Sequence, residues 1–350
     1  MNAVIRAIDY YLPNKELTNT ALSTLFPGRS PEELAEKTGV WARRISAPEE
    51  CSSDLGVAAA EKLFAGSSYS PEDVDFILFC TQTPDYFCPA TACLVQSRLG
   101  IPTRAGALDF NLGCSGYVYG LGLAKGLIQS GQARCVLLVT ADVVTKFIDE
   151  NDRAMRALIG DAATATIIEA TENDDLPGIG QLIYGTDGRG ADHLIIEGGA
   201  LRGFVSHRNN GCSANQKPVV QMKGQKIVEF AVKTVPRVLQ ALMDRSGLRL
   251  EDVDLFVFHQ ASRYILELLV HVLKIPSEKS YVCLSQCGNT VGSTIPIALK
   301  RGSDEEKLFQ GAKVVLCGFG VGLSWGAALV NWSGLRVGKP GDLAMSEHLK

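Results

Sequence analysis

The sequence predicts an α/β fold made of two similar halves, stacked as a five-layer α/β/α/β/α sandwich. Two observations predict it: three segments repeat at one constant offset, and helical segments alternate with short, wholly apolar strands. Strands that are apolar throughout are covered on both faces, which indicates mostly parallel sheets between layers of helices. The 350 residues, 46% of them hydrophobic, supply enough apolar material for such cores.

The repeat has an ungapped offset of 179 residues, which carries Glu72 onto Glu251. The matching segments are 72–79 with 251–258, 111–115 with 290–294, and 135–138 with 314–317. Buried strands resemble one another by chance, but the first pair also shares the charged start Glu-Asp-Val-Asp. We therefore predict a duplicated chain with halves at 1–172 and 173–335, followed by a tail at 336–350 that has little to bury and frays.

Each half is predicted to contain the same series of elements, with helices recognised by apolar periodicity and strands by continuous apolar runs. The first half has helix 55–64, strand 76–80, strand 106–110, helix 116–128 and strand 133–140. The second half has helix 227–243, strand 255–258, a helix from 295, and strands 313–316 and 323–330. Segment 200–217, rich in Asn, Gly and Ser, is predicted to be a loop and a candidate lid.

Composition argues against several classes of function. A net charge of −4 without clustered Lys and Arg is unlike a nucleic-acid-binding protein. The first 13 residues do not resemble a signal peptide, and no run approaches the roughly 18 apolar residues of a membrane span. Ten cysteines without a CxxC pair, and the lack of an HExxH motif, argue against a metal site. We expect a soluble cytoplasmic protein without a metal or cofactor.

Cys114 is the strongest candidate for a nucleophile. It lies between strand 106–110 and helix 116–128, flanked by Gly113 and Gly116. The free N–H groups and the dipole at a helix N-terminus favour a thiolate, so we expect a lowered pKa for this thiol. A thiolate is the nucleophile that attack on a thioester requires. The alternative is a buried structural cysteine.

His259 and Asn289 are candidates for polar groups beside that nucleophile. His259 comes directly after the apolar run 255–258, at the strand's carboxyl end, where open α/β sheets place ligand-binding groups. Asn289 lies in a turn before the second-half helix, where its amide can donate a hydrogen bond without titrating. The repeat aligns His259 with Cys80, so the halves differ there, as one active site per chain would require. The alternatives are a hydrogen-bonded structural histidine and a turn or capping asparagine.

Segment 318–322 carries three glycines and resembles a dinucleotide-binding loop. That loop requires a helix after it, whereas 323–330 is predicted to be a strand. A glycine-rich turn at a strand end can instead aim backbone N–H groups at an oxyanion.

Together these residues resemble the β-ketoacyl-ACP synthase III family of thiolase-fold condensing enzymes. The resemblance covers about 3–332, and its carriers are Thr38-Gly39-Val40, Arg44, 109–116, Asp152-Arg153, Gly160-Asp161-Ala162, His259-Gln260-Ala261, Gly288-Asn289-Thr290 and 320–326. It implies a thiolase fold and an acyltransferase of class EC 2.3.1, working in fatty-acid or specialised secondary-metabolite biosynthesis.

The resemblance also implies a mechanism. Cys114 is acylated by a primer thioester on coenzyme A (CoA) or acyl carrier protein (ACP). His259 and Asn289 stabilise the enolate that forms as a malonyl thioester, carried on ACP, loses carbon dioxide. The backbone N–H groups of Cys114 and Val321 form a second oxyanion hole.

Several of the family's substrate-binding positions are changed here. The resemblance assigns substrate binding to Lys37, Arg153, Gly224 and Ser262. The substitutions are Glu33 for a Trp that stacks on the adenine of CoA, Lys37 for an Arg, Glu229 for a Lys, Ser262 for an Asn and Tyr264 for an Arg. They weaken the case for ordinary acetyl-CoA priming and suggest a specialised member.

The resemblance further implies a homodimer, formed through the strand following Cys114 and the loop before Pro89, in which that loop closes the partner's acyl pocket. The family usually has a Phe before this proline, but here Cys88 occupies that position, with Phe87 one place earlier. A smaller side chain predicts a deeper pocket and primers longer than acetyl.

Three other functions would each account for part of the sequence. A related enzyme could move the acyl group to a hydroxyl or amine acceptor, but Asn289 argues against this because enolate stabilisation is its main use. A catalytically silent partner subunit would not need all three candidate catalytic residues, Cys114, His259 and Asn289. A papain-like protease also orders Cys, His and Asn, but its Cys-Gly-Ser-Cys-Trp signature is missing.

Overall fold

A computed structural model describes residues 1–173, 175–203, 205 and 218–336. Two sequence predictions fall largely outside these ranges: most of the predicted loop 200–217 and nearly all of the predicted tail 336–350. Residues 200–203 are described and are helical, so the loop prediction was wrong there. Among the described residues, no helix has both the length and the apolar character needed to cross a membrane.

The first sheet has the strand order β1-β7-β6-β4-β5. These strands are β1 (Asn2–Tyr11), β4 (Phe76–Cys80), β5 (Gly106–Phe110), β6 (Cys135–Asp142) and β7 (Ala162–Thr171). β4 pairs in parallel with both β5 and β6, whereas β7 is antiparallel to β6 and to β1. β6 is buried along its whole length because sheet neighbours and helices surround it.

The second sheet has the order β11-β12-β13-β8. Its strands are β8 (Ile179–Thr186), β11 (Leu255–Phe258), β12 (Lys313–Gly320) and β13 (Ser324–Asn331). β11 and β12 are parallel, and the other two pairs are antiparallel. β8-β13-β12-β11 therefore has the order and directions of β1-β7-β6-β4. In the stretch equivalent to β5, the second half has a 3₁₀ turn, Leu284–Gln286, instead of a strand.

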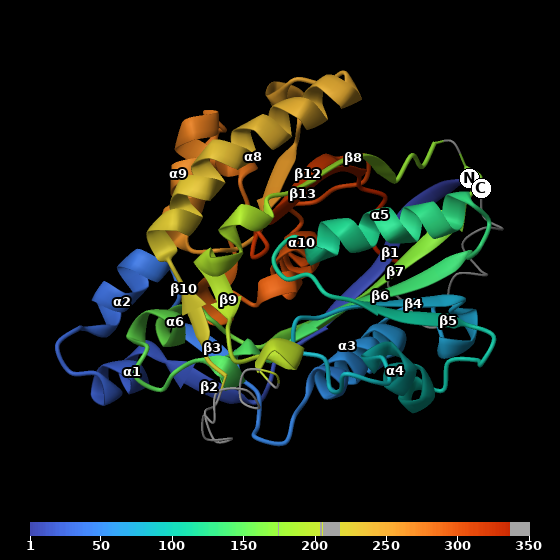
Figure 1. The fold of residues 1–350 in the computed structure, drawn as a ribbon. Coiled ribbons are helices and arrows are strands. Elements are labelled where there is room, and N and C mark those ends of the chain that lie inside the picture. Colours follow the sequence, from blue (N-terminus) through green and yellow to red (C-terminus); the bar gives the residue numbers. More distant parts are fainter. Residues whose placement is uncertain (174, 204, 206–217, 337–350) are drawn as a thin grey trace.

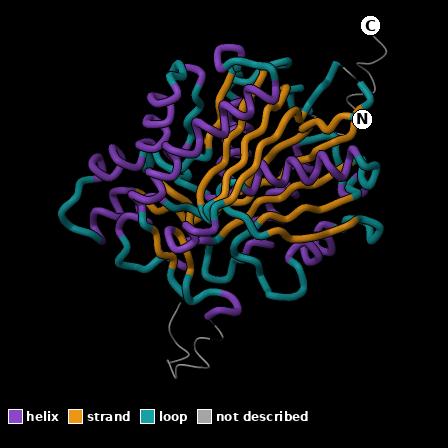
Figure 2. The backbone as a smooth tube through the Cα atoms, turned by 45° about the horizontal axis from the view of Figure 1, so that its top comes forward, coloured by secondary structure: helices purple, strands orange, loops and turns teal. Residues whose placement is uncertain are grey.

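Helices separate and cover the two sheets, which gives the five layers that the sequence predicted (Figures 1 and 2). α5 (Gly116–Gln129) and α10 (Thr294–Asp304) lie between the sheets and share one apolar core with both. α3 (Ser52–Gly66) and α4 (Thr91–Leu99) cover the outer face of the first sheet. α8 (Gly224–Ser246) and α9 (Arg263–Leu273) cover the outer face of the second.

Most predicted elements are present with small changes in their limits. Strands 76–80, 106–110 and 255–258 have the predicted limits, and the helices extend a few residues further. β13 follows the glycine-rich segment directly. A strand in this position confirms that the segment is not a dinucleotide-binding loop, because that loop opens a helix.

The remaining short elements form the edge of the molecule beside the candidate site (Figure 1). They are β2 (Lys15–Thr18), α1 (Asn19–Leu25), α2 (Pro31–Thr38), β3 (Ala42–Ile45), α6 (Arg153–Leu158), β9 (Leu194–Ile196) and β10 (Val220–Met222). Fully buried Arg43 of β3 joins β3 to β2, α1 and α6, since its guanidinium donates to Leu17 O, Asn19 Oδ1 and Ala157 O at 2.9, 2.6 and 2.7 Å. Burial lowers the pKa of Arg43 to about 10, which still leaves it charged at neutral pH.

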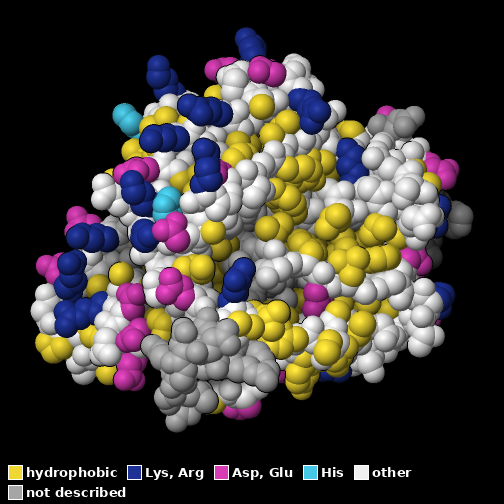
Figure 3. Space-filling model, in the orientation of Figure 1, with side chains coloured by type: hydrophobic (Ala, Val, Ile, Leu, Met, Phe, Trp, Pro, Cys, Tyr) yellow, Lys and Arg dark blue, Asp and Glu magenta, His cyan; other side chains and the backbone are white. Residues whose placement is uncertain are grey.

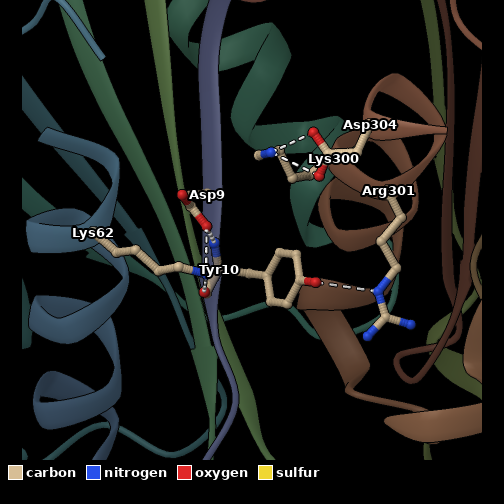
Figure 4. Close-up of polar contacts among 6 residues, drawn as sticks. All are labelled: Asp9, Tyr10, Lys62, Lys300, Arg301 and Asp304. Carbon is tan, nitrogen blue, oxygen red and sulfur yellow. Dashed lines mark hydrogen bonds and ion pairs between the residues drawn. The ribbon is translucent and has the colours of Figure 1, made fainter. Parts of the chain in front are cut away.

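A polar cluster joins the two halves at the C-terminal end of β1 (Figure 4). The ring of Tyr10 lies between Lys62 of α3 and Arg301 of α10, whose Nε donates to the Tyr10 hydroxyl at 3.3 Å. Arg301 also donates to the carbonyl of Cys283 at 3.0 Å. The first half thereby helps to fix the second-half loop that leads to Asn289.

Candidate active site

The candidate site is a cavity of about 700 Å³ beside the C-terminal ends of β4, β6 and β12. Cys114, Asn289 and Val321 lie in its wall. Nine further wall residues are apolar and come from the segment after β6, from α6 and its C-terminal end, and from β9 and β10: Val144, Phe147, Met155, Ile159, Leu194, Ile195, Ile196, Val220 and Met222. A wall of this kind suits an acyl chain better than a polar substrate.

Cys114 lies immediately before the N-terminus of α5 and is 8% exposed. The end of β12 passes against it closely. A Cβ atom added to Gly320 would lie 2.6 Å from the Cys114 sulfur, and one added to Gly318 would lie 2.6 Å from the Cys114 carbonyl oxygen. Only glycine fits at these two positions, so the glycines of 318–322 bring the backbone to the thiol.

The pKa of the Cys114 thiol is raised to about 11. Burial is the main cause, and hydrogen bonds from the backbone N–H groups of Val321 and Cys114 offset only part of it. The predicted lowering of the thiol's pKa was therefore wrong for the free protein: the helix terminus is present, but removal of the thiolate from water outweighs it. The same two N–H groups are those assigned to the oxyanion hole, and both are directed at the thiol.

His259 follows β11 and is 2% exposed. Its backbone N–H donates to Cys317 O at 2.8 Å, which continues the pairing of β11 with β12. Its Nδ1 lies 2.7 Å from the Thr294 hydroxyl, and its ring meets the Phe319 ring edge-on at 5.8 Å. Burial lowers the pKa of His259 to about 3, so the imidazole is neutral at physiological pH.

Asn289 is held by its backbone and by its own amide oxygen. Its N–H donates to Leu158 O at 2.9 Å, and its carbonyl accepts from Gly160 N at 3.1 Å. Its Oδ1 accepts from Val291 N at 3.0 Å, which fixes the orientation of the amide. The Nδ2 group therefore donates to Ala261 O at 3.3 Å and also points toward His259, with 3.5 Å between Nδ2 and Nε2.

The residues predicted to bind substrate are spread over several elements. Phe87 lies in the cavity wall, 79% exposed, whereas Cys88 is exposed outside it. Lys37 is in the last turn of α2, Arg153 begins α6, Gly224 begins α8 and Ser262 caps α9 by accepting from Ile265 N at 3.3 Å. None of these last four is among the residues that line the cavity.

Sequence reasoning missed two features near the site. The guanidinium groups of Arg153 and Arg156 both lie over the Phe26 ring, 5.2 and 5.4 Å from its centre. Thr294 contacts His259 although 35 residues separate them. Neither contact has a local sequence signal, because each joins separate elements.

Comparison with known proteins identifies the family. Residues 108–188 match the family 3-oxoacyl-[acyl-carrier-protein (ACP)] synthase III, and residues 243–332 match the family describing the C terminal part of that synthase. The β-ketoacyl-[acyl-carrier-protein] synthase III 2 of Halalkalibacterium halodurans is 36% identical over 331 residues, which cover 95% of this chain and 97% of that protein.

Solved structures agree with this assignment. A 2.1 Å crystal structure of a 3-oxoacyl-(acyl-carrier-protein) synthase III is similar with a TM-score of 0.91 and 44% identity, covering 95% of this chain and 100% of that one. The priming β-ketosynthase of the R1128 polyketide biosynthetic pathway is similar with a TM-score of 0.86 and 27% identity, covering 95% and 97%. This chain belongs to the β-ketoacyl-[acyl-carrier-protein] synthase III family of thiolase-fold condensing enzymes.

Proposed function

We propose that the protein condenses an acyl thioester primer with a malonyl thioester, with loss of carbon dioxide, through an acyl-Cys114 intermediate. The observation that carries this proposal is the meeting of three groups at one apolar cavity. The Cys114 thiol and the Asn289 amide lie in its wall, and the Nε2 of His259 lies 3.5 Å from that amide. A nucleophile beside two neutral donors is what this chemistry requires.

In the first step, the Cys114 sulfur attacks the carbonyl carbon of the primer thioester. A tetrahedral oxyanion forms and accepts hydrogen bonds from the backbone N–H groups of Cys114 and Val321. The C–S bond of the primer then breaks, and the CoA or ACP thiol leaves with the proton that the Cys114 thiol gave up. The acyl group is left on Cys114, with its chain against the apolar wall of the cavity.

In the second step, the malonyl thioester loses its carboxylate as carbon dioxide. The electron pair of the broken C–C bond forms an enolate, whose oxygen accepts hydrogen bonds from His259 and Asn289. The enolate carbon attacks the acyl-Cys114 carbonyl, and the Cys114 thiolate leaves and takes up a proton. The product is a β-ketoacyl thioester, which remains on the carrier of the malonyl unit.

The names of the relatives support a carrier protein as the partner and fatty-acid or polyketide synthesis as the setting. The malonyl unit then arrives on acyl carrier protein, and the primer on CoA or on a carrier. Four predicted substrate-binding residues lie outside the cavity wall: Lys37, Arg153, Gly224 and Ser262. We therefore assign them to binding of the CoA or carrier part of the thioester and not of its acyl chain.

The cavity supports a primer longer than acetyl. Its wall is largely apolar, and its volume of about 700 Å³ in a single chain leaves room for an acyl chain of more than two carbons. Phe87 contributes to the wall but is 79% exposed in a single chain, so it does not fill the interior. A partner subunit that presents Cys88 in place of a Phe leaves the floor of the pocket deep.

A homodimer is supported by large hydrophobic side chains on the surface. Leu108 on β5, Leu123 on α5 and Tyr184 on β8 are 38%, 45% and 43% exposed. Hydrophobic side chains gather over α5 and the elements beside it on the face drawn in Figure 3. The interface predicted on the strand after Cys114 is wrong, because that strand, β6, is buried between β4 and β7. The edge strand β5 takes its place in the proposal.

The test separates acylation from condensation. The protein is incubated with an acyl thioester alone, and intact mass with peptide mapping should show the acyl group on Cys114. Addition of a malonyl thioester should then release carbon dioxide and form a β-ketoacyl product in equal amounts. An acylated protein that releases no carbon dioxide, yet passes its acyl group to a hydroxyl or amine, would replace condensation with simple acyl transfer.

A further inference from the structure

Stabilisation of the enolate by His259 and Asn289 requires an N–H on each side of its oxygen. Asn289 meets this requirement in the structure. Its Oδ1 accepts a hydrogen bond from Val291 N, which leaves the Nδ2 donor facing His259. His259 does so only in one form. A neutral imidazole carries one proton, and it can donate into the site only when that proton is on Nε2.

The side chain that faces the other ring nitrogen is Thr294, at the start of α10. Its hydroxyl is buried, lies 2.7 Å from His259 Nδ1 and lies 3.2 Å from the carbonyl oxygen of Val291. A hydroxyl has a single proton. If Thr294 donates to Val291 O, it accepts from Nδ1–H and leaves a lone pair on Nε2. If it donates to Nδ1, the proton of the ring is on Nε2.

We infer that Thr294 donates its hydroxyl proton to Nδ1 of His259 and thereby keeps the Nε2–H tautomer that donates to the enolate oxygen. The shorter of the two hydroxyl contacts is the one to Nδ1. Which ring nitrogen of a histidine carries the proton is set by the hydrogen bond that the other nitrogen makes. Thr294 is a positioning residue, since it acts through His259.

The contact between His259 and Asn289 supports this direction. The 3.5 Å between Nε2 and Nδ2 is longer than an ordinary hydrogen bond, which has about 2.7–3.2 Å between heavy atoms. Such a separation fits two donors that face a common acceptor: an oxygen about 2.9 Å from each nitrogen can lie between them. In the opposite tautomer, the Nε2 lone pair would face the enolate oxygen and repel it.

The tautomer can be measured without any assumption about the reaction. The chain has five histidines, so the imidazole signals of protein labelled with ¹⁵N-histidine can be assigned by comparison with His259→Gln. We expect a His259 spectrum with a protonated Nε2 and an unprotonated Nδ1. A protonated Nδ1 in the unchanged protein would overturn the inference, whether or not the protein condenses thioesters.

The kinetic consequence rests on the proposed function. Thr294→Val keeps the shape of the side chain but removes its proton, so decarboxylation of the malonyl thioester should fall about 10- to 100-fold while acylation of Cys114 changes little. The loss should be in kcat, and the His259 spectrum should lose its single Nε2–H form. Thr294→Ser restores the hydroxyl and should recover most of the rate.

Ser293→Ala is the matched control, because Ser293 is equally buried but contacts Thr140 at 2.8 Å and not His259. An equal loss of decarboxylation in this variant, or no loss in Thr294→Val, would show that Thr294 does not act on the tautomer. Should Thr294→Val fail to fold, the spectrum of the unchanged protein still decides the inference. If the unchanged protein releases no carbon dioxide, the proposed function fails. The tautomer assignment is then still decided by the His259 spectrum.

Discussion

The two halves of the molecule share one framework and use it for different chemistry. The four-strand order β1-β7-β6-β4 is repeated as β8-β13-β12-β11, and a buried helix, α5 or α10, follows the same turn in each half. The position just before the first helix holds Cys114, and the equivalent position before the second holds Ser293. The ends of β4 and β11 differ as well, with Cys80 in one half and His259 in the other.

Burial shifts the pKa values of Cys114 and His259, one reactive group from each half, in opposite directions. Burial raises the pKa of Cys114 to about 11 and lowers that of His259 to about 3. These shifts have opposite signs, but they have one physical cause, because a low-dielectric interior disfavours whichever form is charged. The framework therefore holds a neutral thiol and a neutral imidazole at physiological pH. Neutral donors are suited to an enolate oxygen that acquires charge only during the reaction.

The largest effect is expected for the nucleophile. Cys114→Ala should lower condensation by about 10⁴-fold or more, since loss of a nucleophile leaves only binding and the oxyanion hole. Mass spectrometry should find no acyl adduct. A second variant adds Ser293→Cys to Cys114→Ala, which places a thiol at the equivalent position of the second half. The thiol at the equivalent place in the second half should stay unacylated, because Ser293 is fully buried against Thr140. An adduct on the new cysteine would contradict the difference between the halves.

The second effect concerns the donors of the second half. His259→Ala and Asn289→Ala should each leave acylation of Cys114 intact but lower decarboxylation by about 10²- to 10³-fold. Quench-flow measurement of the acyl adduct, with carbon dioxide release in parallel, separates the two steps. Cys80→Ala, changed at the position equivalent to His259, is the control and should affect decarboxylation far less. Normal condensation by both donor variants would show that His259 and Asn289 have a structural role and not a catalytic one.

The third effect is the response to pH. Because the pKa of Cys114 is raised to about 11, its thiolate fraction should increase about tenfold per pH unit from pH 7 to pH 9. The rate of alkylation of Cys114 by iodoacetamide should follow it without a plateau. Decarboxylation by the acylated protein should be flat over this range, since His259, with its pKa lowered to about 3, stays neutral. A plateau in alkylation below pH 8 would indicate that the helix terminus outweighs burial after all.

The smallest effect per single change is expected at the acyl pocket, where primers differ by one methylene at a time. Each methylene that the deep pocket buries should contribute roughly 0.8 kcal/mol, or about fourfold in binding. Competition among primers from acetyl to decanoyl should therefore favour chains longer than acetyl, and Cys88→Phe should shift the preference toward acetyl. A preference for acetyl that Cys88→Phe leaves unchanged would contradict the deep pocket. A monomer in light scattering would contradict a pocket that the partner subunit closes.

The sequence alone indicated the fold class, the limits of strands 76–80, 106–110 and 255–258, and the three catalytic candidates, but it did not indicate β1, β7 or β8. Local and periodic properties can be recognised from the sequence alone, such as the apolar run 255–258 and the constant offset of 179 residues. The glycines of 318–322, followed by a predicted strand, were enough to reject a dinucleotide loop. The interface strand after Cys114, which the resemblance implied, was wrong, because order along the chain does not say which strand lies at the edge of a sheet.

Only the tertiary structure decided the electrostatics of the site. The helix N-terminus at Cys114 predicts a lowered thiol pKa, but burial, to which β12 of the second half contributes by lying against Cys114, raises that pKa instead. The hydroxyl of Thr294 reaches His259 from a different element, and no sequence pattern indicates that distance. Desolvation and hydrogen bonds between elements depend on which distant segments meet, and a sequence read residue by residue does not contain that information.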